Sequence, residues 1–119
     1  MQIAHKFNLH GKVFIVTGGA GLLGLNHAEA IAENGGTVII LDLNLQKAEK
    51  AASSIQSSYR TKSYGYRCDI TNEDEILNVC ESILKKTSRI DGLINNAANN
   101  PSTDNLIISS ELYSIKPKI

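Results

Sequence analysis

Residues 12–24 read Lys-Val-Phe-Ile-Val-Thr-Gly-Gly-Ala-Gly-Leu-Leu-Gly, and this stretch decides the fold. Lys12–Thr17 is a short apolar run between glycines, which predicts a buried β-strand. Leu22–Asn34 then repeats apolar residues at helical spacing and stops at two glycines, which predicts a helix. The first unit of the chain is therefore a strand that passes through a glycine turn into a helix.

The glycine turn satisfies the pattern GxGxxG between the predicted strand and the predicted helix. Without β-carbons the turn can tighten, a pyrophosphate can approach backbone N–H groups, and the helix dipole favours its negative charge. A glycine-rich turn that binds no ligand is the alternative. The residues of this segment that we expect to bind a dinucleotide are Thr17, Gly18, Gly19, Gly21, Leu22, Leu23 and Gly24.

The rest of the chain alternates in the same way between strands and helices. Further strands are expected at 37–42, 63–68 and 93–95, with a helix at 45–57 and another whose apolar stripe runs from Ile76 to Leu84. Thr71-Asn72-Glu73-Asp74 resembles a capping box for that last helix, with Asp in place of Glu or Gln. Strict alternation needs crossover connections, so we predict an α/β fold with a doubly wound parallel sheet of strand order 3-2-1-4.

Composition excludes several classes of partner. Twelve basic residues balance twelve acidic ones among 119, so no net field would gather nucleic acid or an anionic membrane. The apolar runs are too short to cross a bilayer and the start lacks a signal-peptide core, so we expect a cytoplasmic protein. Cys68 and Cys80 predict two reduced, buried thiols rather than a disulfide framework or a metal site.

Asp42 is the second candidate for ligand binding. It ends the second predicted strand, close to the place where a ribose-binding acid follows the glycine pattern by about 20 residues. A carboxylate there accepts hydrogen bonds from both ribose hydroxyls of NAD and repels the extra phosphate of NADP. The sequence therefore predicts NAD as cofactor and makes NADP the weaker alternative, unless Asp42 only begins a turn.

These motifs resemble the short-chain dehydrogenase/reductase family from residue 6 to about residue 101. The resemblance rests on Phe7–Val13, the glycine turn, Cys68–Thr71 and Asn95–Ala98. It implies a Rossmann-type fold, an NAD-dependent oxidoreductase, and adenosine contacts from Asp69, Ile70, Asn95 and Ala97. Asp69 is alternatively a helix-entry residue, and amides at 95 and 96 would bond to neighbouring strands in either interpretation.

A finer resemblance concerns the branch of the family. Gly18, Gly21 and Gly24 match TGxxGxxG, which is similar to the extended branch that modifies sugar nucleotides, whereas Asn95–Ala98 is similar to the shorter branch. Together with Asn95–Pro101, this turn resembles reductases associated with bacterial surface-sugar or flagellin modification.

The family's catalytic Tyr and Lys, spaced YxxxK, follow the fourth strand in a longer chain. Tyr113-Ser114-Ile115-Lys116 has the wrong spacing and is followed by Pro117, so we expect no catalytic residue and no turnover by this chain alone. Residues 1–119 are thus predicted to form one incomplete domain with an irregular tail at 102–119. Its fourth strand would be an open edge prone to self-association. Alternatives are a short NAD or ADP-ribose binding module and a half-enzyme completed by another chain.

Overall fold

A computed structural model describes residues 8–96, and the elements within this range follow the predicted alternation closely. The elements in chain order are β1 (Val13–Thr17), α1 (Leu22–Glu33), β2 (Thr37–Asp42), α2 (Leu45–Tyr59), β3 (Ser63–Arg67), α3 (Glu73–Thr87) and β4 (Gly92–Asn95). The predicted tail at 102–119, the tyrosine and lysine near its end, and Ala97 lie outside the described residues.

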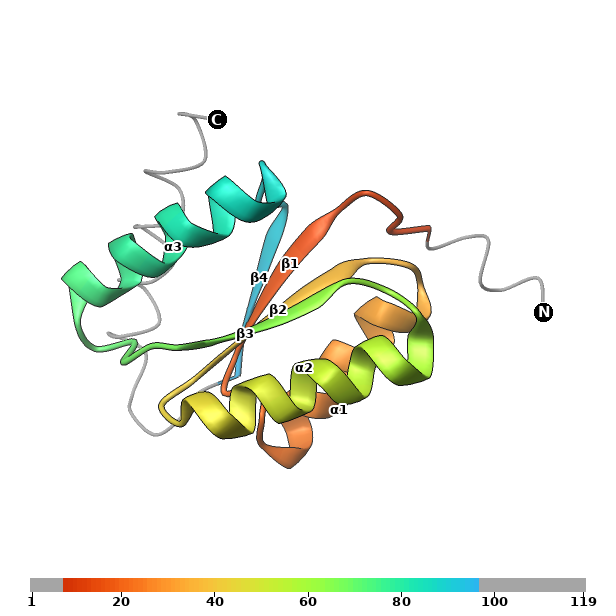
Figure 1. Ribbon diagram of the computed structural model, residues 1–119, viewed down its shortest axis with the longest axis horizontal. Helices are drawn as coiled ribbons and strands as arrows, with labels where there is room; N and C mark the ends of the chain where they lie inside the picture. The colour runs from red at the N-terminus through yellow and green to blue at the C-terminus, as the bar shows by residue number, and fades with distance from the viewer. Residues whose placement is uncertain (1–7, 97–119) are drawn as a thin grey trace.

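The four strands form one parallel sheet in the order β3-β2-β1-β4, which confirms the predicted topology. Helices α1 and α2 cover one face and α3 covers the other (Figure 1). Thr17, at the end of β1, is in register with Leu41 on β2 and with Asn95 on β4. The carboxyl ends of three strands are therefore aligned at one edge of the sheet.

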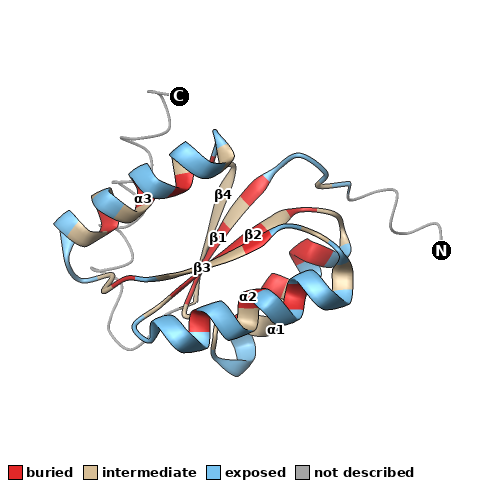
Figure 2. Cartoon of the chain, viewed as in Figure 1, coloured by how far each residue is buried: buried red, intermediate tan, exposed pale blue. Residues whose placement is uncertain are grey.

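The sheet is buried on both faces, and this explains the continuous apolar runs of its central strands. On β2, Ile39 and Leu41 join the apolar cluster beneath α3, while Val38 and Ile40 join the cluster beneath α1 and α2. Burial is concentrated where the helices meet the strands (Figure 2). Because each fully buried Ile or Val contributes about 1.5–3 kcal/mol, the two clusters hold the strand ends in place.

An asparagine side chain caps the start of both α2 and α3. Asn44 caps α2 by accepting a hydrogen bond from the Lys47 N–H at 3.0 Å, and Asn72 caps α3 by accepting one from the Glu75 N–H at 3.2 Å. The predicted cap at Thr71 is wrong by one residue. Thr71 instead donates its N–H and its hydroxyl to Asp69 Oδ1, so the chain makes a turn there and the helix starts later.

Both cysteines are buried, reduced thiols, as predicted. Cys68 lies in the cluster beneath α3 with only 2% of its surface exposed. Burial, together with the nearby Glu75 and Asp69 carboxylates, raises the pKa of its thiol from 9.0 to about 11. The folded chain therefore holds this proton more tightly than the unfolded chain does.

We expect this thiol to make the free energy of unfolding fall as the pH rises from about 9 to about 11, because only the unfolded chain ionises readily in that range. Below pH 9 the thiol is protonated in both states and contributes no slope. Urea unfolding of the wild type and of Cys68→Ala across this range measures the effect. The variant should show a flatter dependence, and equal slopes would contradict the assignment.

Candidate functional site

The aligned strand ends lie where the order of strands in the sheet reverses direction. The chain leaves β1 toward β2 and β3 on one side of the sheet and returns to β4 on the other. In open parallel sheets, ligands bind outside the carboxyl ends of strands at such a reversal of strand order. The glycine turn, which follows β1, lies at this point, and three neighbouring strand ends surround it.

The glycine turn is attached to β2 and folds back on itself. The Gly18 N–H donates to the Leu41 carbonyl at 2.8 Å, and the Gly21 N–H donates to the Gly18 carbonyl at 3.1 Å. Gly18 has φ of +63°, a conformation that side chains with a β-carbon rarely adopt. This backbone conformation turns the chain directly from β1 into the start of α1.

Gly24 brings α1 into direct contact with the turn. A β-carbon at Gly24 would lie 2.2 Å from the Gly18 carbonyl oxygen and 2.9 Å from Asn96 Nδ2, so the helix could not pack where it does. A β-carbon at Gly21 would meet only the Gly18 carbonyl, at an ordinary 3.5 Å. The third glycine of the pattern is thus required by packing, whereas the packing around Gly21 would accommodate a β-carbon.

The N-terminus of α1 lacks the side-chain cap that α2 and α3 both have. Gly21 is its N-cap, makes no side-chain cap, and no acidic residue follows in the first turn. By contrast, α3 has both the Asn72 cap and three acidic residues in its first turn. The first N–H groups of a helix have no partner within it and carry positive partial charge. The α1 start is therefore suited to an anion.

Asp42 occupies the end of β2 beside this turn. It is half-buried, and its Oδ1 accepts a hydrogen bond from the Asn44 N–H at 3.0 Å. Its carbonyl accepts from the Cys68 N–H at 2.9 Å, which keeps the ends of β2 and β3 together. The structure therefore brings Asp42 to the same edge as the glycine turn, as the spacing predicted.

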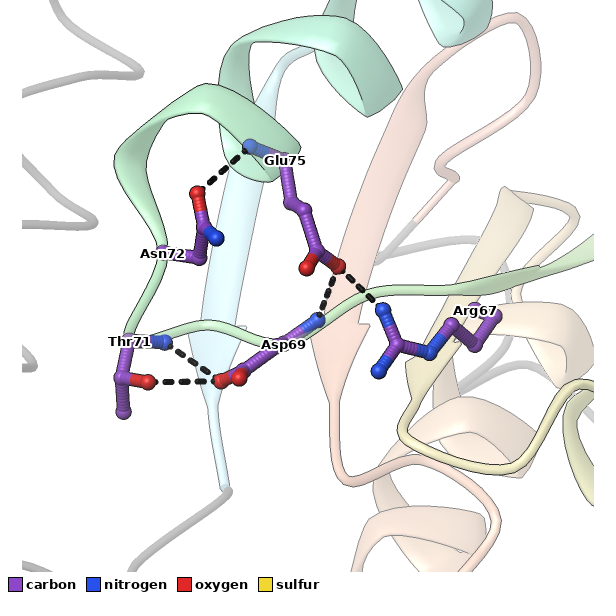
Figure 3. Close-up of polar contacts among 5 residues, drawn as sticks. All are labelled: Arg67, Asp69, Thr71, Asn72 and Glu75. Atoms are coloured by element: carbon purple, nitrogen blue, oxygen red, sulfur yellow. Dashed lines mark hydrogen bonds and ion pairs between the residues drawn. The ribbon is translucent and has the colours of Figure 1, made fainter.

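Asp69 and Ile70 lie in the loop between β3 and α3. Asp69 Oδ1 accepts from the Thr71 N–H at 3.0 Å and from the Thr71 hydroxyl at 2.7 Å, and these bonds hold the pKa of its carboxyl below the ordinary value (Figure 3). Its N–H donates to Glu75 Oε1 at 3.0 Å. Asp69 thus serves helix entry, and half-buried Ile70 packs against the cluster beneath α3.

Glu75 makes a second contact that the sequence reasoning missed. Its Oε1 also accepts from Arg67, the last residue of β3, so one carboxylate joins the strand end, the loop and the helix (Figure 3). The available signal was a glutamate three residues after a capping asparagine, which is a capping-box position. Here that glutamate reaches the loop instead of its own cap.

Asn95 and Asn96 connect β4 to β1 through Thr17. The Thr17 hydroxyl donates to Asn95 Oδ1 at 2.9 Å and accepts from the Asn96 N–H at 3.0 Å. Asn96 Nδ2 donates to the Gly18 carbonyl at 3.3 Å, so it supports the glycine turn directly. The expected bonds between these amides and the neighbouring strand are present. Within residues 8–96, the buried Asn95 Nδ2 makes no hydrogen bond.

The described part of the chain has neither a metal-binding cluster nor a membrane-spanning helix. Over residues 8–96, no three His, Cys, Asp or Glu side chains gather as a metal site would require. In the same range, no helix has both the length and the apolar character needed to cross a membrane.

Comparison with known proteins identifies relatives of this fold and site. Residues 12–113 match the short chain dehydrogenase family. Tropinone reductase-like 2 of Erythroxylum coca is 37% identical over 93 residues, which are 78% of this chain and 32% of the relative. Cyclopentanol dehydrogenase of Comamonas testosteroni is 35% identical over 89 residues, which are 75% of this chain and 35% of the relative. The chain thus spans about a third of these curated relatives.

Solved structures agree. The NADPH-dependent 3-quinuclidinone reductase of Rhodotorula rubra superposes with a TM-score of 0.71 at 31% identity, covering 76% of this chain and 34% of that one. A xylitol dehydrogenase with bound NAD+ superposes with a TM-score of 0.76 at 28% identity, covering 92% of this chain and 48% of that one.

The two glycines of the turn should respond differently to substitution. We expect Gly24→Ala to lower the free energy of unfolding by about 1–3 kcal/mol, because the new methyl group overpacks the turn. Gly21→Ala is the matched control and should lower it by less than Gly24→Ala does, since its methyl group makes only an ordinary contact with the Gly18 carbonyl and the remaining cost is that of alanine at an N-cap. Chemical denaturation measures both values. Equal losses in the two variants would contradict the packing argument.

Proposed function

The chain belongs to the short chain dehydrogenase family of NAD(P)-dependent oxidoreductases, and from this premise we propose that it binds the adenosine half of NAD at the carboxyl edge of its sheet. The diphosphate would meet the glycine turn and the start of α1, with the ribose at Asp42 and the adenine near Asp69 and Ile70. Thr17 and Asn95 would form the side nearest to β4, and Ala97, outside the described residues, stays a predicted contact.

One observation carries this proposal, namely the uncapped start of α1. Its N-cap is a glycine without a side-chain hydrogen bond, and its first turn has no acid, so the N–H groups and the helix dipole face outward. The neighbouring Gly18 carbonyl oxygen accepts hydrogen bonds from the Gly21 N–H and from Asn96 Nδ2. Because this oxygen is already paired, it does not repel an anion as an unpaired carbonyl would. A diphosphate would supply the acceptors that these N–H groups lack.

The side chains around this edge also fit a dinucleotide. Within residues 8–96, the exposed large apolar side chains are Leu22, Leu23, Leu43 and Leu45, which lie at the start of α1 and at the start of α2. Exposed leucines beside a few polar groups are typical of sites for flat aromatic ligands. The buried Asn95 Nδ2, unbonded within the same range, provides an additional donor at the β4 side.

A preference for NAD over NADP is part of the proposal. The Asp42 carboxylate would accept from the ribose hydroxyls and would repel a 2′-phosphate. The relatives include an NADPH-dependent enzyme and an NAD+-bound enzyme, so the preference rests on Asp42 and not on kinship.

Oxidoreductase chemistry would come from the nicotinamide, which accepts or donates hydride when the cofactor is bound. The residues described here would bind and orient the adenosine half.

The expectation that this chain alone lacks turnover stays a prediction. The cytoplasmic location, the incomplete single domain and the surface-sugar branch stay predictions as well. The non-catalytic binding module and the half-enzyme completed by another chain share the same binding site.

Isothermal titration with NAD, ADP-ribose and NADP tests the proposal. We expect NAD and ADP-ribose to bind with similar affinity, because the described residues would contact only their common part. Asp42→Ala should weaken NAD binding about tenfold or more, since it removes charge-assisted hydrogen bonds to the ribose. Saturable binding that is unaffected by this substitution would contradict the placement of the ribose, and absence of binding by the folded chain would reject the function.

We also propose that the chain self-associates through β4. Among the described strands, β4 pairs only with β1, on one side, and its residues are all half-buried. An open strand edge presents unpaired N–H and C=O groups that favour pairing with another chain. Sedimentation velocity over a range of concentrations should show concentration-dependent dimers. A monomer at every concentration would contradict this expectation.

A further inference from the structure

Arg67 brings a positive charge to the edge of the proposed dinucleotide site. It ends β3 and is the register partner of Asp42 on β2. Adjacent strands lie about 4.8 Å apart, and partners in a parallel pair share a face of the sheet, so the long arginine side chain has the reach to enter the space beside Asp42. Neither the sequence motifs nor the proposed function uses this residue.

Glu75 binds the Arg67 guanidinium from the first turn of α3. Glu75 Oε1 accepts from Arg67 Nη1, and the same oxygen accepts from the Asp69 N–H at 3.0 Å (Figure 3). The Arg67 side chain is 47% exposed and that of Glu75 is 32% exposed, so solvent and other ions can reach the pair. Without the Glu75 carboxylate, the exposed guanidinium would be available to bind a doubly charged phosphate.

We propose that Glu75 is a specificity-determining residue, which disfavours NADP by keeping Arg67 from binding a 2′-phosphate beside Asp42. This inference rests on the proposed function, because it concerns the ribose end of the same site. The Asp42 carboxylate repels the 2′-phosphate of NADP. The Glu75 carboxylate binds the Arg67 guanidinium, which could otherwise bind that phosphate. Both carboxylates, Asp42 on β2 and Glu75 on α3, would lower the affinity for NADP.

The chemistry of the phosphate explains why the arginine matters. Arginine binds phosphate through two parallel N–H donors, and NADP-binding members of this fold class accommodate the 2′-phosphate with an arginine near the end of β2. Arg67 lies one strand further out, in register with that position. A free guanidinium there would offset part of the repulsion from Asp42.

The first test is Glu75→Gln in the full 119-residue chain, with titration of NAD and NADP. Glutamine keeps an oxygen acceptor for the Asp69 N–H but loses the charge that holds Arg67. We expect the affinity ratio of NADP to NAD to rise about tenfold, which corresponds to one charge-assisted contact. High salt should reduce this gain, because the new contact is exposed and ionic.

Glu73→Gln is the matched control. Glu73 lies in the same first turn of α3 and is exposed. Its substitution by glutamine removes the same charge without releasing Arg67. Its affinity ratio should stay within about twofold of the wild type, because only a screened distant charge is lost.

Arg67→Ala identifies the residue through which Glu75 acts. Added to Glu75→Gln, it should abolish the gain in NADP affinity, whereas alone it should leave the ratio within about twofold, because Glu75 already holds the arginine. The single Arg67 variant also provides a test if Glu75→Gln does not fold. A marked loss of NADP affinity in that variant would overturn the proposal.

The remaining outcomes separate this inference from the proposed function. If NAD binds every variant but the ratio does not move in Glu75→Gln, or the gain persists without Arg67, the role of Glu75 is rejected and the site stands. If the wild-type chain binds neither dinucleotide, the proposed function fails and this inference fails with it.

Discussion

The contact between the Gly24 backbone and the Gly18 carbonyl governs the position of everything else at the candidate site. Because no β-carbon intervenes, α1 begins directly against the turn that ends β1, and its N-terminus points outward at the edge of the sheet. Asn96 Nδ2 donates to the same carbonyl from the β4 side. A side chain at position 24 would separate helix, turn and strand together, so one close approach supports three elements.

The strand ends converge because Thr17 joins them with its hydroxyl as well as its backbone. β1 is paired on both sides, and at its last residue the side chain donates to Asn95 and accepts from Asn96. These bonds stabilise the strand ends, since leaving a buried polar group unsatisfied costs about 1–3 kcal/mol. The two apolar clusters fix the sheet between its helices, and these few polar bonds fix the edge where chemistry is expected.

Charge is distributed unequally between the two ends of this edge. The start of α1 has no acidic residue, whereas the start of α3 has three, together with Asp69 and the ion pair between Arg67 and Glu75. An anionic group is therefore favoured at α1 and disfavoured toward α3. A dinucleotide would extend across this gradient with its diphosphate at the start of α1. At the other end, the Arg67–Glu75 pair would determine the affinity for a 2′-phosphate.

The sequence by itself determined the order of elements, the parallel 3-2-1-4 sheet and the location of the glycine turn and Asp42, because apolar periodicity and glycine placement are local properties of the chain. It also indicated that the amides at 95 and 96 would bond to neighbouring strands. Only the tertiary structure decided that Asn72 rather than Thr71 caps α3, that Asn96 supports the turn at Gly18, and that Glu75 binds Arg67, the register partner of Asp42. The contact of Asn96 with Gly18 joins segments 78 residues apart, so it is set by how the strands align. The cap and the ion pair depend on the turn that Thr71 makes with Asp69, which sets where α3 starts.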